Sequence, residues 1–146
     1  MNQSRYLCTL VPACLLLAAP GALLSQAPVR ITGIYGDLHY VEEAGDVIGT
    51  EIIVSRTKTR YRVVFQEGVG EPGPVDTVEA TVRGDSLFFQ LPPDSVYQRG
   101  PNGTPQWVVR RRLFRGRVTA AALYGRLDGM WNPLALPRRA RSARLR

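Results

Sequence analysis

Cysteine is scarce in this chain of 146 residues, and the only two, Cys8 and Cys14, lie near the N-terminus. The residues around them have the form of a secretory signal peptide. Arg5 supplies the positive start, and residues 10–24 form an apolar run without charge. We expect residues 1–27 to be removed on export, which leaves a mature chain without cysteine. Disulfides, thiol nucleophiles and thiolate metal ligands are thereby excluded from the mature protein.

The end of this segment leaves the cleavage position open. Residues 25–27 form a small-x-small exit, but Pro28 follows directly, so cleavage between Gly21 and Ser25 is an alternative. A retained membrane anchor is less favoured, because a bilayer span needs about 20 apolar residues and prolines interrupt this run. Lipid attachment at Cys14 is a further alternative. No second apolar run follows that could span a membrane, so we expect a periplasmic or extracellular protein.

Histidine and lysine are also nearly absent, with one of each, His39 and Lys58. A transition-metal site needs histidine, cysteine or clustered carboxylates, so we expect neither a metal nor a cofactor. His39 shares its strand parity with Asp37 and, with Glu51, is the first candidate for the site of a small hydrolase. No Gly-x-Ser-x-Gly elbow accompanies these residues. We therefore interpret these residues as surface residues and expect that the protein is not an enzyme.

Acidic residues are nearly absent from the C-terminal part of the chain. Residues 108–146 hold eleven arginines and one acid, Asp128, whereas residues 30–107 hold seven basic and eleven acidic residues. Because guanidinium groups pair well with phosphate, this region favours an anionic envelope surface as partner, and we expect no specific nucleic acid. A solvated basic face without a ligand is the alternative. The predicted anion-binding residues are Arg110, Arg111, Arg112, Arg115, Arg117, Arg138 and Arg139.

The mature chain has no long apolar stripe of helical period, and its pattern is that of short β-strands separated by turn residues. The clearest alternation, at Val78, Ala80 and Val82, leads into the two-residue turn Gly84-Asp85, which is typical of a hairpin. We expect strands at 29–41, 47–55, 61–66, 78–83, 87–91, 107–118 and 123–127, loops at 67–76 and 92–105, and a short helical turn at 119–122.

These strands, joined mostly by local connections, predict an all-β fold. We expect a single small antiparallel meander barrel, with a β-sandwich as the alternative. Closure into a barrel removes the exposed edges that an open sheet would leave. The chain then divides into a helical signal peptide (1–27), a β domain (28–136) and an Arg-rich tail (137–146). We expect the tail to be disordered, because it has too few apolar groups to pack.

Several glycine-bearing segments are similar to those of a known type of barrel. Residues 32–36, Thr-Gly-Ile-Tyr-Gly, resemble the first strand of small lipocalin-like or calycin-like barrels. Residues 114–118 and 123–127 resemble the paired closing strands of exported bacterial barrels of this type, and the turn at 84–87 fits their hairpins. The resemblance implies a barrel with an internal ligand cavity.

These patterns lead to three hypotheses of function. The first is a non-enzymatic exported barrel that binds a small apolar ligand or an envelope component. The second is a peripheral envelope protein that binds anionic lipid or polymer through its Arg-rich C-terminal part, and the third is a small hydrolase. For the first, a pocket at the barrel mouth is expected to be lined by Tyr35, Val63, Phe65, Phe89 and Leu123.

Overall fold

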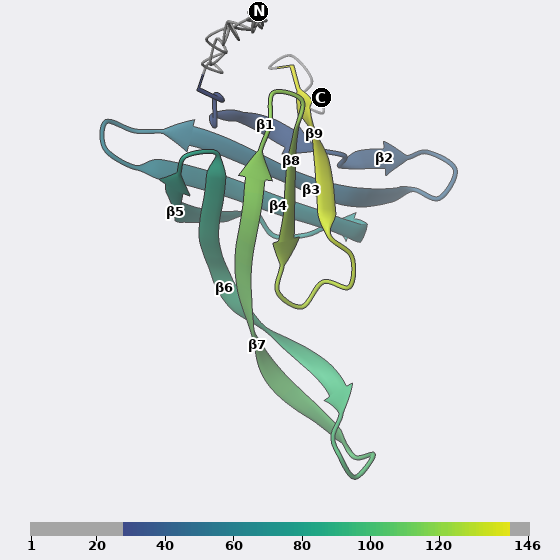
Figure 1. Cartoon of the computed structure of the whole chain (residues 1–146). Helices are drawn as coiled ribbons and strands as arrows, with labels where there is room; N and C mark the ends of the chain where they lie inside the picture. Colours follow the sequence, from purple (N-terminus) through teal and green to yellow (C-terminus); the bar gives the residue numbers. More distant parts are fainter. Residues whose placement is uncertain (1–27, 141–146) are drawn as a thin grey trace, which may run out of the picture.

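The computed structural model describes residues 28–140, which form nine β-strands and no helix (Figure 1). The strands are β1 (Gly33–Gly36), β2 (His39–Val41), β3 (Asp46–Arg56), β4 (Tyr61–Pro72), β5 (Asp76–Arg83), β6 (Ser86–Arg99), β7 (Pro105–Val118), β8 (Ala122–Leu127) and β9 (Leu134–Arg139). Within this range no helix is long and apolar enough to cross a membrane. The predicted signal peptide, with Cys8 and Cys14, and residues 141–146 lie outside the described residues.

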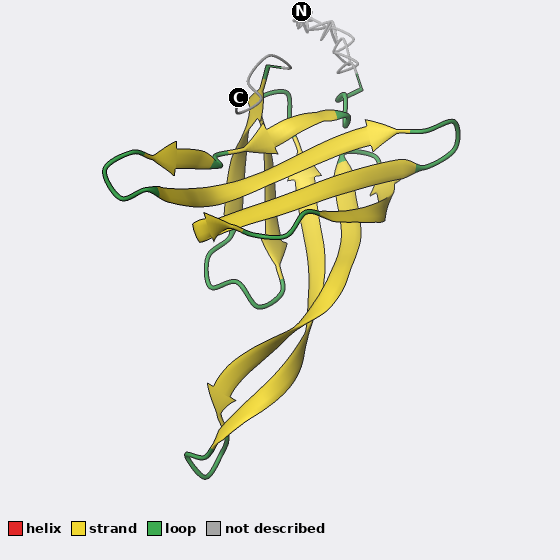
Figure 2. Cartoon of the chain, turned by 180° about the vertical axis from the view of Figure 1, so that it is seen from behind, coloured by secondary structure: helices red, strands yellow, loops and turns green. Residues whose placement is uncertain are grey.

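The strands form one antiparallel sheet that closes on itself, as Figure 2 shows from behind. The order is β1-β9-β8-β7-β6-β5-β4-β3, and β1 also pairs with β3, so eight strands make a closed barrel. In β1, Ile34 lies opposite Ile53 of β3 on one side and opposite Arg139 of β9 on the other. β2 is an additional strand that pairs with β3 beyond the end of β1. The predicted all-β fold and meander barrel are confirmed.

β9 is the strand that the sequence pattern does not predict. Pro137 lies opposite Ala122 of β8, and Arg138 and Arg139 pair with β1, so the prediction of a tail is wrong for residues 137–139. Alternation over this short segment is weak, and a proline argues against a central strand. β9 is stabilised by hydrogen bonds to β1 and β8 on its two sides and by burial of the Leu136 side chain. Only the closed barrel supplies both partner strands and the interior that buries Leu136.

Both predicted loops are largely strand, and the predicted helical turn is a hairpin connection. β4 continues to Pro72, because Gly68 permits a close approach to β3; a Cβ there would lie 2.6 Å from the carbonyl oxygen of Val47. β6 continues to Arg99, because a bulge between Leu91 and Asp94 removes the two intervening prolines from the hydrogen-bond ladder. Between β7 and β8, residues 119–122 form a hairpin turn closed by a backbone hydrogen bond of 2.8 Å.

The outer halves of β6 and β7 leave the barrel as a two-stranded ribbon, which projects away from it and twists in Figure 1. We call residues 94–110 the ribbon. Beyond the bulge, the pairing runs from Asp94 opposite Arg110 to Arg99 opposite Pro105. The ribbon has no neighbouring strand on either side, since β5 and β8 pair only with the inner parts of β6 and β7.

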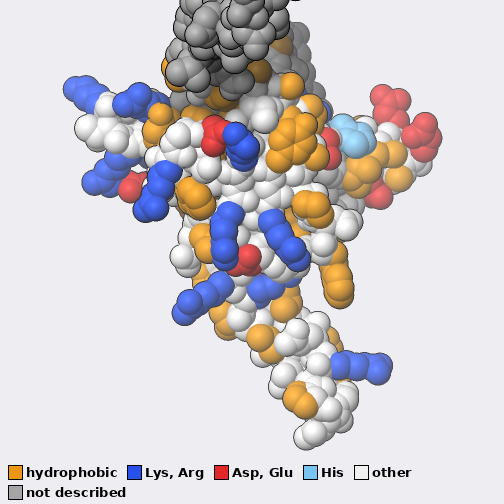
Figure 3. Space-filling view, viewed as in Figure 1, with side chains coloured by type: hydrophobic (Ala, Val, Ile, Leu, Met, Phe, Trp, Pro, Cys, Tyr) orange, Lys and Arg blue, Asp and Glu red, His pale blue; other side chains and the backbone are white. Residues whose placement is uncertain are grey.

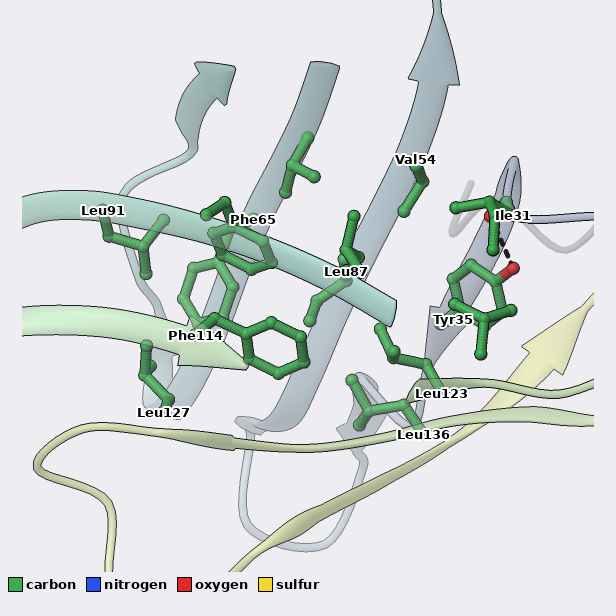
Figure 4. Close-up of a cluster of buried hydrophobic side chains, with 14 residues drawn as sticks. Ile31, Tyr35, Val54, Phe65, Leu87, Leu91, Phe114, Leu123, Leu127 and Leu136 are labelled. Carbon is green, nitrogen blue, oxygen red and sulfur yellow. Dashed lines mark hydrogen bonds between the residues drawn. The ribbon is translucent and has the colours of Figure 1, made fainter. Parts of the chain in front are cut away.

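The barrel interior is filled by large apolar side chains from seven of the eight strands of the ring (Figure 4), and β5 adds partly buried side chains that pack against them. At its centre Phe114 stacks on Phe89, with ring centroids 4.6 Å apart and planes at 17°, and Phe65 lies 6.5 Å from Phe89. Glycines on β7 and β8 make room for this stack. A Cβ at Gly116 would lie 2.6 Å from the ring of Phe114, so the aromatic ring and the glycine depend on each other.

Replacement of Phe114 by alanine is expected to lower the free energy of unfolding by about 3–5 kcal/mol, because the buried ring leaves a cavity between two glycines. Tyr124, which is exposed on the outer wall of β8, is the matched control, and Tyr124→Ala is expected to cost less than about 1 kcal/mol. Urea unfolding followed by circular dichroism measures both. Equal losses in the two variants would contradict the assignment of Phe114 to the centre of the core.

Candidate anion-binding site

The five residues predicted to line a ligand pocket all lie in the core. Tyr35, Val63, Phe65, Phe89 and Leu123 are buried and pack in one cluster. Neither of the two surface cavities described below contains any of them. Among residues 28–140, these side chains therefore satisfy one another in the barrel interior, and their burial is explained by packing alone.

Arg112 is predicted to bind an external anion, but it points into one end of the barrel. It shares the inward parity of Phe114 on β7, and its side chain is only 13 % exposed. Its guanidinium group lies over the ring of Phe65, 5.4 Å from the centroid. Three carboxylates surround it, those of Asp76 at 3.4 Å, Glu67 at 3.8 Å and Asp94 at 3.9 Å. Arg112 is thus neutralised within the fold.

Arg110 occupies the next inward position and is held by Asp94 in a bidentate pair. Its Nε and Nη2 donate to the two carboxylate oxygens at 3.1 and 2.6 Å, and its Nη1 donates to the carbonyl oxygen of Gly129 at 2.8 Å. The hydrogen bonds from Arg110 lower the pKa of the Asp94 carboxyl group, and the same pairing raises the pKa of Arg110. Arg110 therefore ties the ribbon to the β8–β9 loop.

Two of the three outward-facing arginines of β7 lie beside a carboxylate. Arg115 lies 3.7 Å from Asp128, and Arg117 donates a short hydrogen bond to Asp85, which lowers the pKa of that carboxyl group. Arg111, at the base of the ribbon, has no carboxylate within salt-bridge distance among the residues described here. The arginines of β7 are therefore divided between the inward and outward faces of the strand, and most are paired with carboxylates.

Arg138 and Arg139 line a different surface, an open groove between β1, the end of β3 and the end of β9. The groove has a volume of about 1050 Å³, and none of its lining residues is acidic. Two further arginines, Arg30 and Arg56, complete a set of four. We call this surface the arginine groove. It lies toward the β3–β4 turn, the end where Figure 3 shows Lys and Arg, whereas acidic side chains gather at the β2–β3 turn.

The arginines of the groove are oriented by neutral groups rather than by carboxylates. Arg138 donates to the hydroxyl of Tyr35 at 2.6 Å, to the carbonyl oxygen of Thr32 at 3.2 Å and to that of Arg30. Its guanidinium carbon lies 4.9 Å from the centroid of the Tyr35 ring. Arg139 donates to the carbonyl oxygen of Leu38 at 3.1 Å. Held in this way, the groups keep their full positive charge.

Tyr35 links this groove to the core. Its hydroxyl donates to the carbonyl oxygen of Ile31 at 2.7 Å and accepts from Arg138. Burial raises the pKa of the Tyr35 hydroxyl, while the positive charges of Arg138 and Arg30 act in the opposite direction. The Tyr35 side chain, which is predicted from the sequence to contact a ligand, packs under the guanidinium group of Arg138.

The acid and base candidates Asp37, His39 and Glu51 do not form a catalytic arrangement. Nδ1 of His39 lies 2.6 Å from the backbone oxygen of Asp37, not from its carboxylate. That carboxylate accepts the N–H of Thr50 at 2.8 Å and so bridges the gap between β1 and β2, while Glu51 lies opposite Gly36 in the sheet. Across residues 28–140 no group of three or more His, Cys, Asp or Glu side chains could hold a metal ion.

Arg30 and Arg56 are the groove residues that the sequence analysis misses. They lie far from the Arg-rich C-terminal part, at the entrance to β1 and at the end of β3. Only the pairing of β1 with both β3 and β9 brings them to Arg138 and Arg139. The one signal in the sequence is that Arg30 and Arg56 each lie at the end of an apolar segment that forms a strand. A side chain at such a position lies at one end of the barrel.

Replacement of Asp94 by asparagine is expected to lower the free energy of unfolding at pH 7 by about 1–2 kcal/mol, because Arg110 and Arg112 lose a charged partner. Since the pKa of Asp94 is lowered in the fold, its contribution is present above the ordinary aspartate pKa of about 3.9 and is lost as pH falls below that value. The variant is therefore expected to lose less stability than the wild type between pH 5 and pH 2 in urea titrations.

The control for this prediction is Glu79→Gln, which removes an exposed pair with Arg60 and is expected to leave the free energy of unfolding almost unchanged, because solvent screens exposed ion pairs. If Asp94→Asn and the wild type lose the same stability on acidification, the pairing of Asp94 with Arg110 does not contribute as described.

Comparison with protein-family models, with curated proteins and with solved structures found no match to this chain. The closed eight-stranded antiparallel barrel is compatible with the lipocalin-like architecture that the strand and glycine pattern resembles. Among the surfaces of residues 28–140, the arginine groove concentrates positive charge without an acidic residue in its lining.

Proposed function

We propose that this chain is an exported, non-enzymatic barrel of lipocalin-like architecture that binds an anionic component of the cell envelope in the arginine groove. The observation that carries the proposal is that four guanidinium groups, and no carboxylate, line one groove. The chemistry in question is that of phosphate groups, since planar guanidinium groups bind phosphate oxygens through paired N–H donors.

The charge pattern supports this groove over the arginines of β7. Arg110, Arg112, Arg115 and Arg117 each have a carboxylate within 4 Å, and an external anion would have to compete with it. The arginines of the groove have backbone carbonyl groups, hydroxyl groups and aromatic rings as neighbours. One of these rings is that of Tyr61, which lies beneath Arg56. An incoming anion there gains the full attraction of the site.

The sequence adds further positive charge after the groove. Arg139 is followed in the chain by Arg141, Arg144 and Arg146, with no acid among them. A ligand with several phosphate groups, either an anionic polymer or the surface of an anionic bilayer, matches such a continuous supply of arginine better than a single small anion does.

Removal of two groove charges tests the proposal. In the double variant Arg56→Gln/Arg139→Gln, the affinity for polyphosphate is expected to fall at least about tenfold, with a shallower dependence on salt, because fewer counterions are displaced on binding. Fluorescence anisotropy with labelled polyphosphate at several salt concentrations measures both quantities. Arg138 is left unchanged, because it supports Tyr35 and the fold.

The matched control is Arg115→Gln/Arg117→Gln, which removes the same charge from the outer face of β7 and is expected to weaken binding less than about threefold. Equal losses in both double variants would mean a diffuse basic surface and would overturn the groove. A parallel arm with phosphatidylglycerol vesicles separates a lipid headgroup from a free phosphate polymer, and failure to bind either probe would overturn the proposed function.

A further inference from the structure

Both tryptophans of the sequence are exposed, Trp107 at 71 % and Trp131 at 96 %. Tryptophan is the side chain that gains most from burial, so two exposed tryptophans in a small domain indicate a contact surface. Trp107 lies on the ribbon, and Trp131 lies in the β8–β9 loop. The two are at the same end of the barrel, because Arg110 of the ribbon bonds to Gly129 of that loop and shares with Trp131 a cavity of about 330 Å³.

The outer face of the ribbon carries an aromatic pair. Tyr97, which is 61 % exposed, lies directly opposite Trp107, and the ring centroids are 5.2 Å apart. Val109, also exposed, follows on the same face. Within residues 28–140 no other strand pairs with the ribbon, and an isolated two-stranded ribbon has little stability of its own. The ribbon therefore holds an apolar face in water that a partner can bury.

The charges around this face have one sign. Arg99 lies beyond the aromatic pair and Arg111 lies at the base, both exposed and on the same side of the ribbon. The ribbon beyond Asp94, residues 95–110, contains no acidic residue. Tyrosine and tryptophan flanked by arginine match the interface of an anionic bilayer, where aromatic rings lie at headgroup level and guanidinium groups lie near phosphates. A polysaccharide fits less well, because rings tilted by 58° offer no flat platform for a sugar.

We infer that the ribbon is an arm that binds the interface of an anionic lipid bilayer, with Tyr97 and Trp107 among the headgroups and Arg99 and Arg111 at the phosphates. Trp131 adds a second contact at the base of the arm. This inference goes beyond the proposed function and does not depend on it, because the ribbon projects from the side of the barrel opposite the end of β9, where Arg138 and Arg139 lie (Figure 1). Apart from Trp131 in the β8–β9 loop, the barrel carries the arm and takes no direct part in the contact.

Tryptophan fluorescence tests the inference directly. In Trp131→Phe, Trp107 is the only tryptophan, and its emission is expected to shift to shorter wavelength with phosphatidylglycerol-containing vesicles and to be quenched by brominated lipid chains. Pure phosphatidylcholine vesicles are expected to give a much smaller shift. The exported form of the protein is used, so that the apolar residues 10–24 do not contribute. No change in emission with anionic vesicles would overturn the inference.

Vesicle co-sedimentation of variants locates the contact. Tyr97→Thr/Trp107→Thr is expected to lose at least about tenfold in affinity for anionic vesicles, whereas Tyr124→Thr, an exposed aromatic on the barrel wall, is expected to lose less than about threefold. Arg99→Gln/Arg111→Gln is expected to reduce the dependence on salt. These positions lie outside the core, so an unchanged urea midpoint shows that the barrel is folded, and equal losses in the ribbon and wall variants would overturn the assignment.

Two further outcomes would reassign the arm. If the Trp107 shift occurs with a neutral dextran and not with vesicles, the arm binds a polysaccharide. If the wild type is a dimer by analytical ultracentrifugation and the Tyr97/Trp107 variant is a monomer with unchanged vesicle binding, the aromatic face joins two copies of the chain. The groove variant Arg56→Gln/Arg139→Gln is expected to keep the Trp107 shift, so failure of the groove proposal is distinguished from failure of this one.

Discussion

The antiparallel pairing of β1 with both β3 and β9 is the constraint on which the rest of the structure depends. Four residues, Gly33–Gly36, join the two edges of the sheet and turn it into a barrel. Closure encloses the apolar cluster in the interior of the ring. It also sets Tyr35 in the interior and brings the end of β9 against the start of β1. The arginine groove is a direct product of this seam.

Arginine lies over an aromatic ring near both ends of the barrel, but the two ends compensate its charge differently. Arg112 over Phe65 is surrounded by Glu67, Asp76 and Asp94, whereas Arg138 over Tyr35 has a phenol and backbone carbonyl groups as partners. Neutral partners accept hydrogen bonds from Nη1 and Nη2 of Arg138 without cancelling its charge. The charges at the first end therefore compensate one another, and the second end keeps a net positive field.

Under the two proposals, the molecule has separate surfaces at opposite ends. The ribbon would rest on a bilayer, and the groove would face away from it, where it could hold a phosphate-bearing polymer. The bulge at Pro92 and Pro93 matters for this arrangement, because it lets β6 and β7 leave the barrel without a break in their pairing. The bidentate pair of Arg110 and Asp94 lies at the point of departure and braces the arm against the β8–β9 loop.

Local chemistry alone is enough to predict the all-β class, the meander and most strand positions, since alternation at Val78, Ala80 and Val82 and the turn at Gly84 depend only on near neighbours. It also identifies arginine as the charged residue that dominates the C-terminal part of the chain. Tertiary structure decides what β9 is, because a strand interrupted by Pro137 is stable only between two partners. Tertiary structure also decides which arginines are paired with carboxylates. The alternation of side chains on β7 directs Arg112 into the barrel, where carboxylates surround it, and closure of the barrel places Arg30 and Arg56 beside Arg138. Charge compensation is a property of distances between segments remote in sequence, and only the folded barrel sets those distances.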